Sequence, residues 1–442
     1  MLTQRFREHL DQAGLLAGPG LALLAVSGGA DSLALLDLIA GIAPARGLEL
    51  LVVHADHGIH PESAKVAAMV SRVAAERYAL DSVVERFALG ADAGETIARE
   101  ARYAFFRRVQ AGRGGRFLVT AHHSDDQVET VLLRLLRGSA PAGLAGIPER
   151  GADGLVRPLL PFRRAELAAH VAACGLEPFA DPANADLRHN RSWVRTSLLP
   201  LLRDRFGEAA EEHLLSVARH AEAELVAWDA ALDLFSGIDA QVRAGLVDVA
   251  RAPLADYDSQ LSARLLRAGA RRAGIMLGPA QAQRVIAFAR QAASGRSLEL
   301  GEGVIAEVAF ERLVLRRIVA LPEPRPLAGD AGVQSFGGFD LSWRPERAPE
   351  HLDRGGWTTW IVPGTLEVRL PAQGSRMVPL RGVGHRSVSK LMMEERIPRG
   401  ARSSWPVVMC DGEPVWIPGV CRADAAIPEP GAAAVRLDAA TR

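Results

Sequence analysis

The sequence has few cysteines and no long apolar run, and these absences exclude several classes of protein. Its three cysteines, Cys174, Cys410 and Cys421, are far apart and form neither a CxxC pair nor a metal-ligand cluster. We therefore expect no disulfide framework and a reducing cytoplasm. No uninterrupted apolar stretch approaches the ~20 residues of a membrane-spanning helix. Residues 1–20 are charged and amphipathic, without the apolar core of a signal peptide, so we expect a cytoplasmic protein with no membrane partner.

The sequence also lacks an excess of positive charge and has almost no lysine. Lysine and arginine together number 52, as do aspartate and glutamate, so the formal net charge is zero. This balance argues against indiscriminate nucleic-acid binding but allows a local basic face. Lys65 and Lys390 are the only lysines. Arginine suits bidentate phosphate contacts, but its general dominance resembles a genome-wide bias, so no single arginine identifies a site.

The length and composition predict a globular protein of two to three domains. The chain has 442 residues, of which 48% are hydrophobic and 24% are charged. We expect a catalytic domain at 1–205, a mostly helical domain with a small hairpin at 206–322, and a small α+β domain at 330–442. The segment before residue 330, PEPRPLAG, has the composition of a linker.

Short apolar runs alternate with helical patterns through the first domain. Runs at 21–26, 48–54, 82–87 and 116–120 predict buried parallel strands. Their alternation with helices predicts an α/β fold with a doubly wound, Rossmann-like parallel sheet. Ligands of such sheets bind at the carboxyl ends of the strands, so the loops after these runs are the first places to look for a site.

The loop after the first run has the composition of an anion-binding turn. Its residues are Ser27, Gly28, Gly29, Ala30, Asp31 and Ser32. Glycines let backbone N–H groups approach a ligand, and a helix N-terminus adds about half a positive charge. Asp31 would repel a phosphate, so its presence favours a divalent metal between the two. Without further context, the same residues also fit an ordinary strand-to-helix turn capped by Ser32.

Four titratable residues gather behind the fourth apolar run. They are His122, His123, Asp126 and Glu129, at the start of a predicted helix. Asp126 and Glu129 are three residues apart and so share one helix face. Such a group is costly at a strand end without a ligand or a metal. Acids that complement the helix dipole would explain Asp125 and Asp126 but not the other three.

Three further segments carry candidate ligands. A helix at 95–108 places Arg99 and Arg102 on one face. The segment 54–60 carries histidines after the second strand, which fit either a site or an ordinary loop. The segment 189–195, which includes Arg191, is rich in donors, as a loop that touches phosphate or nucleic acid would be, although an ordinary surface loop has a similar composition.

The last third of the chain has strand character with a basic insertion. Strands are predicted at 339–343, 358–362, 365–370 and 406–420, and a helix at 388–395. The cations between them include Lys390 and Arg402. Such a segment is either solvated surface or a phosphate-binding face.

These motifs, taken in order, carry a family resemblance. They are SGGADS, HADHGI, ETIAREARY, AHHSDDQVETVLLRLLRGS, RPLL, DPANADLRHNRSWVR and KLMMEERIPRGARSSWPVV…GEPVWIPGV, between residue 27 and about residue 422. Together they resemble the tRNA(Ile)-lysidine synthetases, a family within the PP-loop ATP pyrophosphatases. SGGADS alone marks only the superfamily, whereas the AHHSDDQVET block and the C-terminal block are more selective. Two departures from the family pattern are His60, in place of arginine, and Ile147, in place of methionine.

The resemblance implies a cofactor set, substrates and a reaction. ATP would bind through residues 27–32, with Mg²⁺, and the C2 oxygen of the wobble cytidine in a CAU-anticodon tRNA(Ile) would attack its α phosphate. Free L-lysine would then attack C2 through its side-chain amine and expel AMP. The products are lysidine, AMP and pyrophosphate. A homodimer is compatible with the sequence, which does not determine the oligomeric state.

The same resemblance assigns roles to the residues found above. Asp31 and Asp126 would hold Mg²⁺, and Glu129 would meet the lysine ammonium or deprotonate it. His122, Arg102 and Arg191 would stabilise charge on the phosphates or on the adenylated intermediate. Lys390 and Arg402 would grip tRNA phosphates.

Three alternatives remain open at this point. A 2-thiocytidine-type tRNA thiolase of the PP-loop group is the nearest, but its sulfur chemistry needs cysteines, usually a CxxC pair, which this chain lacks. A small-molecule ligase of the same superfamily would leave the C-terminal half unexplained. A non-catalytic ATP- or RNA-binding module would not require the acids Asp31, Asp126 and Glu129.

Overall fold

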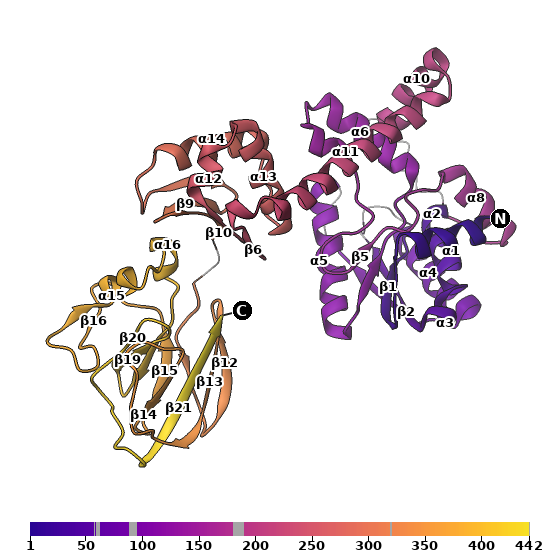
Figure 1. Cartoon of the computed structure of the whole chain (residues 1–442). Helices are drawn as coiled ribbons and strands as arrows, with labels where there is room; N and C mark the ends of the chain where they lie inside the picture. The colour runs from indigo at the N-terminus through magenta and orange to yellow at the C-terminus, as the bar shows by residue number, and fades with distance from the viewer. Residues whose placement is uncertain (57, 59–61, 88–94, 180–189, 319–320, 442) are drawn as a thin grey trace. The chain divides into compact units, whose positions relative to one another are not determined.

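The computed structural model in Figure 1 describes residues 1–442 except 57, 59–61, 88–94, 180–189, 319–320 and 442. The chain forms two compact units, Met1–Val226 and Ala227–Arg442, and each is described by itself. Within the described ranges, no helix has the length and apolar character needed to cross a membrane. His57 and His60, whose roles the sequence leaves open, and most of the loop before Arg191 lie outside the described residues.

The first unit is built on a five-stranded, wholly parallel sheet. Its strands are β1 (Gly20–Ala25), β2 (Leu48–Asp56), β3 (Ser82–Arg86), β4 (Phe117–Val119) and β5 (Leu155–Val156). Their order is β3-β2-β1-β4-β5. This confirms the predicted doubly wound sheet. The strand order reverses between β1 and β4, and ligands of open α/β sheets bind at that reversal.

Helices cover both faces of this sheet (Figure 1). The helices between the N-terminus and the end of α11, which extends beyond Val226, are α1 (Leu2–Gln12), α2 (Ala30–Ala40), α3 (Ala43–Arg46), α4 (Ser63–Tyr78), α5 (Glu95–Arg113), α6 (Ser124–Leu136), α7 (Pro141–Leu144), α8 (Arg164–Ala173), α9 (Asn190–Trp193), the π-helical turn η2 (Val194–Leu198), α10 (Leu199–Phe206) and α11 (Ala209–Leu234). Helix α5 packs Phe105 and Phe106 on one face, and α1, α2, α4 and α8 share the core on the other. The strand β5 was not predicted, because two residues are too short to give a pattern.

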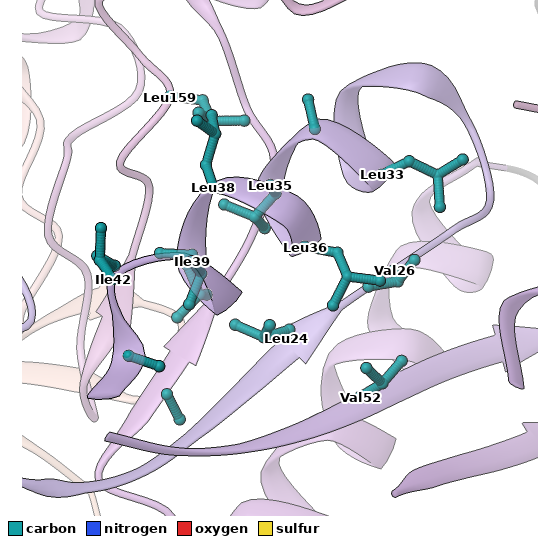
Figure 2. Packing of buried hydrophobic residues seen from close by; sticks show 14 of the residues in the cluster. Leu24, Val26, Leu33, Leu35, Leu36, Leu38, Ile39, Ile42, Val52 and Leu159 are labelled. Carbon is teal, nitrogen blue, oxygen red and sulfur yellow. The ribbon is translucent and has the colours of Figure 1, made fainter. Parts of the chain in front are cut away.

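The core of the first unit fixes the start of helix α2. This helix is apolar on almost every side, as expected for a helix that is buried all round. Figure 2 shows its side chains packed against residues of β1, β2 and the segment after β5. The labelled residues are Leu24, Val26, Leu33, Leu35, Leu36, Leu38, Ile39, Ile42, Val52 and Leu159. Each fully buried leucine contributes about 2 kcal/mol to the stability of the folded unit. Because β1 and α2 are both packed in this core, the loop between them is held in place at both of its ends.

The second unit begins with helices packed on an antiparallel sheet. The helices are η3 (Ser236–Ile238), α12 (Arg251–Asp256), α13 (Ser259–Arg272) and α14 (Pro279–Gln291), and the strands are β6 (Gln241–Arg243), β7 (Leu246–Ala250), β8 (Ser297–Gly301), β9 (Val304–Ala309) and β10 (Arg312–Arg317). The helices predicted at 263–272 and 279–293 are present. The strand content exceeds the predicted hairpin, since all five strands join in the order β6-β7-β10-β9-β8. The strands β6 and β7, of three and five residues, are too short for an alternation of apolar and polar residues to predict them.

The remaining residues form a β-rich part with two larger sheets. One sheet has the order β11-β15-β18-β19-β20, another β12-β13-β21-β14, and β16 pairs with β17. The elements are β11 (Arg325–Pro326), β12 (Gly332–Phe336), β13 (Phe339–Arg347), β14 (Thr358–Ile361), β15 (Leu366–Arg369), β16 (Arg376–Met377), β17 (Arg386–Ser387), α15 (Val388–Glu394), α16 (Arg399–Arg402), β18 (Val407–Cys410), β19 (Glu413–Ile417), β20 (Cys421–Arg422) and β21 (Ala433–Thr441). The predicted strands and the helix α15 are confirmed.

Candidate active site

The loop between β1 and α2 is organised by one hydroxyl group. Ser32 Oγ accepts hydrogen bonds from the backbone N–H groups of Ser27 and Gly28, each at 3.1 Å, and donates to the Gly29 carbonyl at 2.9 Å. Among the described residues, the N–H groups of Gly29, Ala30 and Asp31 have no partner. These are donors of the helix start, and they are the groups that an anion at this end of α2 would meet.

The two glycines of this loop differ in backbone conformation and in the space around them. Gly28→Ala is expected to lower the free energy of unfolding of the first unit by about 2 kcal/mol. Gly28 has φ +91°, and an added Cβ would lie 2.8 Å from Val66 Cγ1. Urea unfolding of the purified variant measures this change.

Gly29→Ala is the matched control for that variant. Gly29 has φ −75°, and the nearest atom to an added Cβ is Ser27 Oγ at 3.8 Å. We expect its free energy of unfolding to fall by less than about 1 kcal/mol, since only the preference of the residue at the start of the helix changes. If the two variants lost equal stability, the close contact at position 28 would not be the cause of the loss in Gly28→Ala.

His54 supports the loop from the neighbouring strand. Its Nδ1 lies 2.7 Å from the Val26 carbonyl oxygen, and its side chain is buried. Burial lowers the pKa of His54, so the neutral ring donates its Nδ1 hydrogen to that carbonyl. His54 therefore holds the end of β1 in place.

His123 lies between the two predicted metal ligands. Its Nε2 is 3.4 Å from Asp31 Oδ2 and 3.5 Å from Asp126 Oδ2, and its Nδ1 is 3.5 Å from Asp125 Oδ2. Its backbone N–H also donates to Asp126 Oδ2 at 3.1 Å. The loops that follow β1 and β4 are thus joined by one buried imidazole. The sequence placed His123 in the acidic block but did not assign it this contact with Asp31.

The two adjacent histidines have opposite shifts in pKa. Burial opposes charge on His123, but hydrogen bonds to Asp125 and Asp31 and the charge of Asp126 raise its pKa to about 9. Burial, and then the positive charges of Arg157, Arg99, Arg191 and Arg102, lower the pKa of His122 to about 3. At neutral pH, His123 is therefore an imidazolium and His122 is a neutral ring near several guanidinium groups.

These shifts predict a stability maximum near pH 6.5. The raised pKa of His123 stabilises the folded unit below about pH 6.5, and this contribution is lost as the pH rises to about 9. The lowered pKa of His122 has the reverse effect, and its contribution is lost as the pH falls from about 6.5 to about 3. Urea unfolding at several pH values measures both slopes.

The variant His123→Gln tests the loss of stability above pH 6.5. We expect the wild-type protein to have a higher free energy of unfolding than this variant at pH 6.5, and the difference to fall by about 3 kcal/mol between pH 6.5 and pH 9. A difference that is independent of pH in this range would show that His123 is not charged in the folded protein.

Glu129 is fully buried and is enclosed by two arginines. Its Oε2 accepts from Arg191 Nε at 2.8 Å, and its Oε1 accepts from Arg195 Nε at 2.6 Å. Arg191 also reaches Asp126 Oδ1 at 3.4 Å. In this arrangement Glu129 orients guanidinium groups beside Asp126. A substrate ammonium could reach its oxygens only by displacing one of them.

Arg195 is a site residue that the sequence did not single out. It lies in the π-helical turn η2, four residues after Arg191, and so faces the same carboxylate. Turns of this type are frequent at functional sites. The spacing of the two arginines was visible in the sequence, but their shared partner on α6 was not.

The donors around Asp31 fit a hard divalent cation. Asp31 Oδ1 is buried and lacks a hydrogen-bond partner among the described residues, which is costly for a carboxylate oxygen. Asp31 and Asp126 approach the same imidazole nitrogen from the ends of two adjacent parallel strands. Carboxylate oxygens are the ligands that Mg²⁺ prefers, and it commonly takes one or two of them together with substrate phosphates.

The fold and the loop geometry agree with the domain families that the chain matches. Residues 2–202 match the PP-loop domain family, and residues 366–439 match the TilS substrate C-terminal domain family. The first unit is thus a PP-loop nucleotide-binding domain. The whole chain is 32% identical to tRNA(Ile)-lysidine synthase of Symbiobacterium thermophilum, over 95% of this chain and 94% of that protein. The chain belongs to the tRNA(Ile)-lysidine synthase family.

A second relative and one solved structure are also similar to this chain. The chain is 35% identical to tRNA(Ile)-lysidine synthase of Thermus thermophilus, over 87% of this chain and 71% of that protein. A solved structure of U34-tRNA thiolase NcsA from Methanococcus maripaludis aligns with 50% of this chain and 78% of its own, at TM-score 0.42 and 17% identity. A likeness this weak carries no argument for the thiolase alternative.

Proposed function

We propose that this protein ligates L-lysine to C2 of the wobble cytidine in tRNA(Ile) with a CAU anticodon, using ATP. The observation that carries the proposal is the meeting of two loops at the strand reversal, where Asp31 and Asp126 both face His123. Family membership supplies the substrates, since the relatives are named as tRNA(Ile)-lysidine synthases. The reaction proceeds in two steps through an adenylated cytidine.

In the first step, the ATP phosphates bind at the start of helix α2. The N–H groups of Gly29, Ala30 and Asp31 donate to phosphate oxygens, and the helix dipole favours their negative charge. The C2 oxygen of the cytidine attacks the α phosphorus, the bond to the β phosphate breaks, and pyrophosphate leaves. Asp31 and Asp126 would hold Mg²⁺, which neutralises phosphate charge during this transfer.

In the second step, the side-chain amine of lysine attacks C2 and AMP leaves. Arg191, held by Glu129, stabilises negative charge on the departing phosphate, and the charges of Arg102 and Arg191 both act on neutral His122. The amine must lose protons to become lysidine. Glu129 remains our candidate for meeting the lysine ammonium, on condition that one arginine moves toward the phosphate.

We assign residues 206–322 and 330–442 to tRNA binding, with the β-rich part contacting phosphates. The basic residues Arg381, Lys390 and Arg396 are exposed there. Replacing all three by glutamine is expected to weaken tRNA binding and to flatten the dependence of log K on log salt. The slope falls by roughly 0.9 for each duplex phosphate that the protein no longer neutralises. Binding titrations at several salt concentrations measure both effects.

A matched variant separates this effect from a general change in charge. Arg7, Arg72 and Arg113 are exposed in the first unit. Replacing these three by glutamine changes the net charge equally but should leave the salt slope almost unchanged. Equal slopes in the two triple variants would contradict a tRNA contact at Lys390 and its neighbours.

The overall reaction is tested by the substrates that AMP formation requires. We expect AMP release only when ATP, lysine and the CAU-anticodon tRNA are all present. AMP formed with lysine but without tRNA would support a small-molecule ligase. AMP formation that needs tRNA and a sulfur donor would support the thiolase alternative.

A further inference from the structure

A second cluster of ligating side chains lies outside the candidate active site. Asp37 on α2 meets His170 on α8 and Cys174 just after α8. Asp37 Oδ2 is 2.8 Å from His170 Nε2 and 3.5 Å from Cys174 Sγ, and Sγ is 3.7 Å from Nε2. The spacing of the cysteines among themselves did not indicate this cluster, in which Cys174 takes part without Cys410 or Cys421. The sequence signal was the spacing of four residues between His170 and Cys174, which places both on one helix face.

Two of the three separations agree closely with a tetrahedral zinc site. Zinc bonds are ~2.3 Å to sulfur and ~2.05 Å to nitrogen or oxygen. In a tetrahedral site, the sulfur then lies about 3.5 Å from the nitrogen or oxygen ligand, and the nitrogen and oxygen ligands lie about 3.3 Å apart. The two sulfur separations of 3.5 and 3.7 Å already match. Only the His170–Asp37 pair, at 2.8 Å, would have to open by about half an ångström.

The surroundings also suit a bound cation. Tyr78 donates its hydroxyl hydrogen to Asp37 Oδ1 at 2.8 Å, so the carboxylate is held with Oδ2 facing the other two ligands. The side chains of His170 and Asp37 are 14% and 22% exposed, which leaves access for an ion and for a water molecule. A thiolate, an imidazole and a carboxylate together select zinc-like cations over Mg²⁺.

We propose that Asp37, His170 and Cys174 form a binding site for Zn²⁺ or a similar thiophilic divalent cation, with water as the fourth ligand. On binding, the thiol of Cys174 releases its proton to solvent, and His170 coordinates through Nε2 as the neutral ring. The cation would join α8 to α2, the helix that begins at the nucleotide loop. Asp37 is six residues beyond Asp31, about 9 Å along the helix axis, so this site is separate from the one assigned to Mg²⁺.

Cobalt provides the direct test, because Co²⁺ replaces Zn²⁺ and absorbs light according to its ligands. We expect Co²⁺ bound at this site of the metal-free full chain to give a thiolate-to-cobalt charge-transfer band and the visible bands of a four-coordinate ion. Zn²⁺ should abolish these bands, whereas Mg²⁺ in excess should not. Absence of the charge-transfer band in the wild-type chain would overturn the proposal without any variant.

Variants then identify the ligands. Cys174→Ser should remove the charge-transfer band, and His170→Gln should weaken cobalt affinity at least tenfold. Cys410 and Cys421 stay in both variants and serve as internal controls for other thiols. Asp31→Asn should keep the band, because that residue belongs to the other site. A band that survives Cys174→Ser in a variant with wild-type circular dichroism would overturn the assignment.

Discussion

Asp31→Asn is expected to lower the rate of tRNA-dependent AMP formation by about a thousandfold or more. The substitution keeps the size of the side chain but removes the charge that would hold a cation against the phosphates. Charge stabilisation of this kind is worth several kcal/mol, and each 1.36 kcal/mol is a factor of ten in rate. Steady-state AMP formation measures the loss, and we expect the same result for Asp126→Asn.

Asp31→Asn removes one of the carboxylates that hold His123 as an imidazolium, so we expect a modest loss of stability together with the loss of turnover. Urea unfolding of the variant shows whether it stays folded under the assay conditions and so separates catalysis from folding. Asp153→Asn is the matched control, since Asp153 is exposed and has φ +53°, a conformation that asparagine adopts readily. Wild-type turnover in Asp31→Asn, or an equal loss in Asp153→Asn, would refute the metal assignment.

Glu129→Gln is expected to destabilise the first unit by about 3 kcal/mol and to abolish turnover. The glutamine keeps the shape of the side chain but leaves Arg191 and Arg195 facing an uncharged group. Breaking a buried ion pair on one side costs about 3–5 kcal/mol. The lower end applies because the two arginine side chains are 28% and 27% exposed. Urea unfolding, with hydrogen exchange across α6 and η2, measures the change locally.

An exposed pair on the same unit provides the comparison. Glu212 accepts from Arg219 at 2.7 Å, but their side chains are 57% and 60% exposed. Glu212→Gln should therefore cost less than about 1 kcal/mol and leave activity unchanged. Similar losses of stability in Glu129→Gln and Glu212→Gln would mean that the buried carboxylate does not organise the arginines.

The fold of the first unit could be predicted because most of its strands are buried on both faces. Such strands appear as continuous apolar runs, as at 21–26, 48–54 and 116–120, whereas β3, predicted at 82–87, is a partly exposed edge strand. Strands β5, β6 and β7 escaped prediction because they have only two, three and five residues, which is too short for a local pattern to define them.

The candidate site was only partly accessible from sequence spacing. Spacing placed Asp126 and Glu129 on one helix face, and the chain order of motifs put Asp31 at the neighbouring strand end. Spacing could not indicate that His123 lies between Asp31 and Asp126, or that Arg195 closes over Glu129. These are tertiary contacts between side chains far apart in sequence, and they depend on how the elements pack.

The chemical identity of the modified base tests most directly the central claim that lysine is joined to the wobble cytidine. Isotopically labelled lysine is incubated with the protein, ATP and a CAU-anticodon tRNA(Ile), and the digested RNA is analysed by mass spectrometry. Our account predicts one lysine per tRNA, attached at C2 of the wobble cytidine, with AMP formed in equal amount. An unmodified wobble cytidine despite AMP release, or a cytidine that carries sulfur instead of lysine, would contradict it.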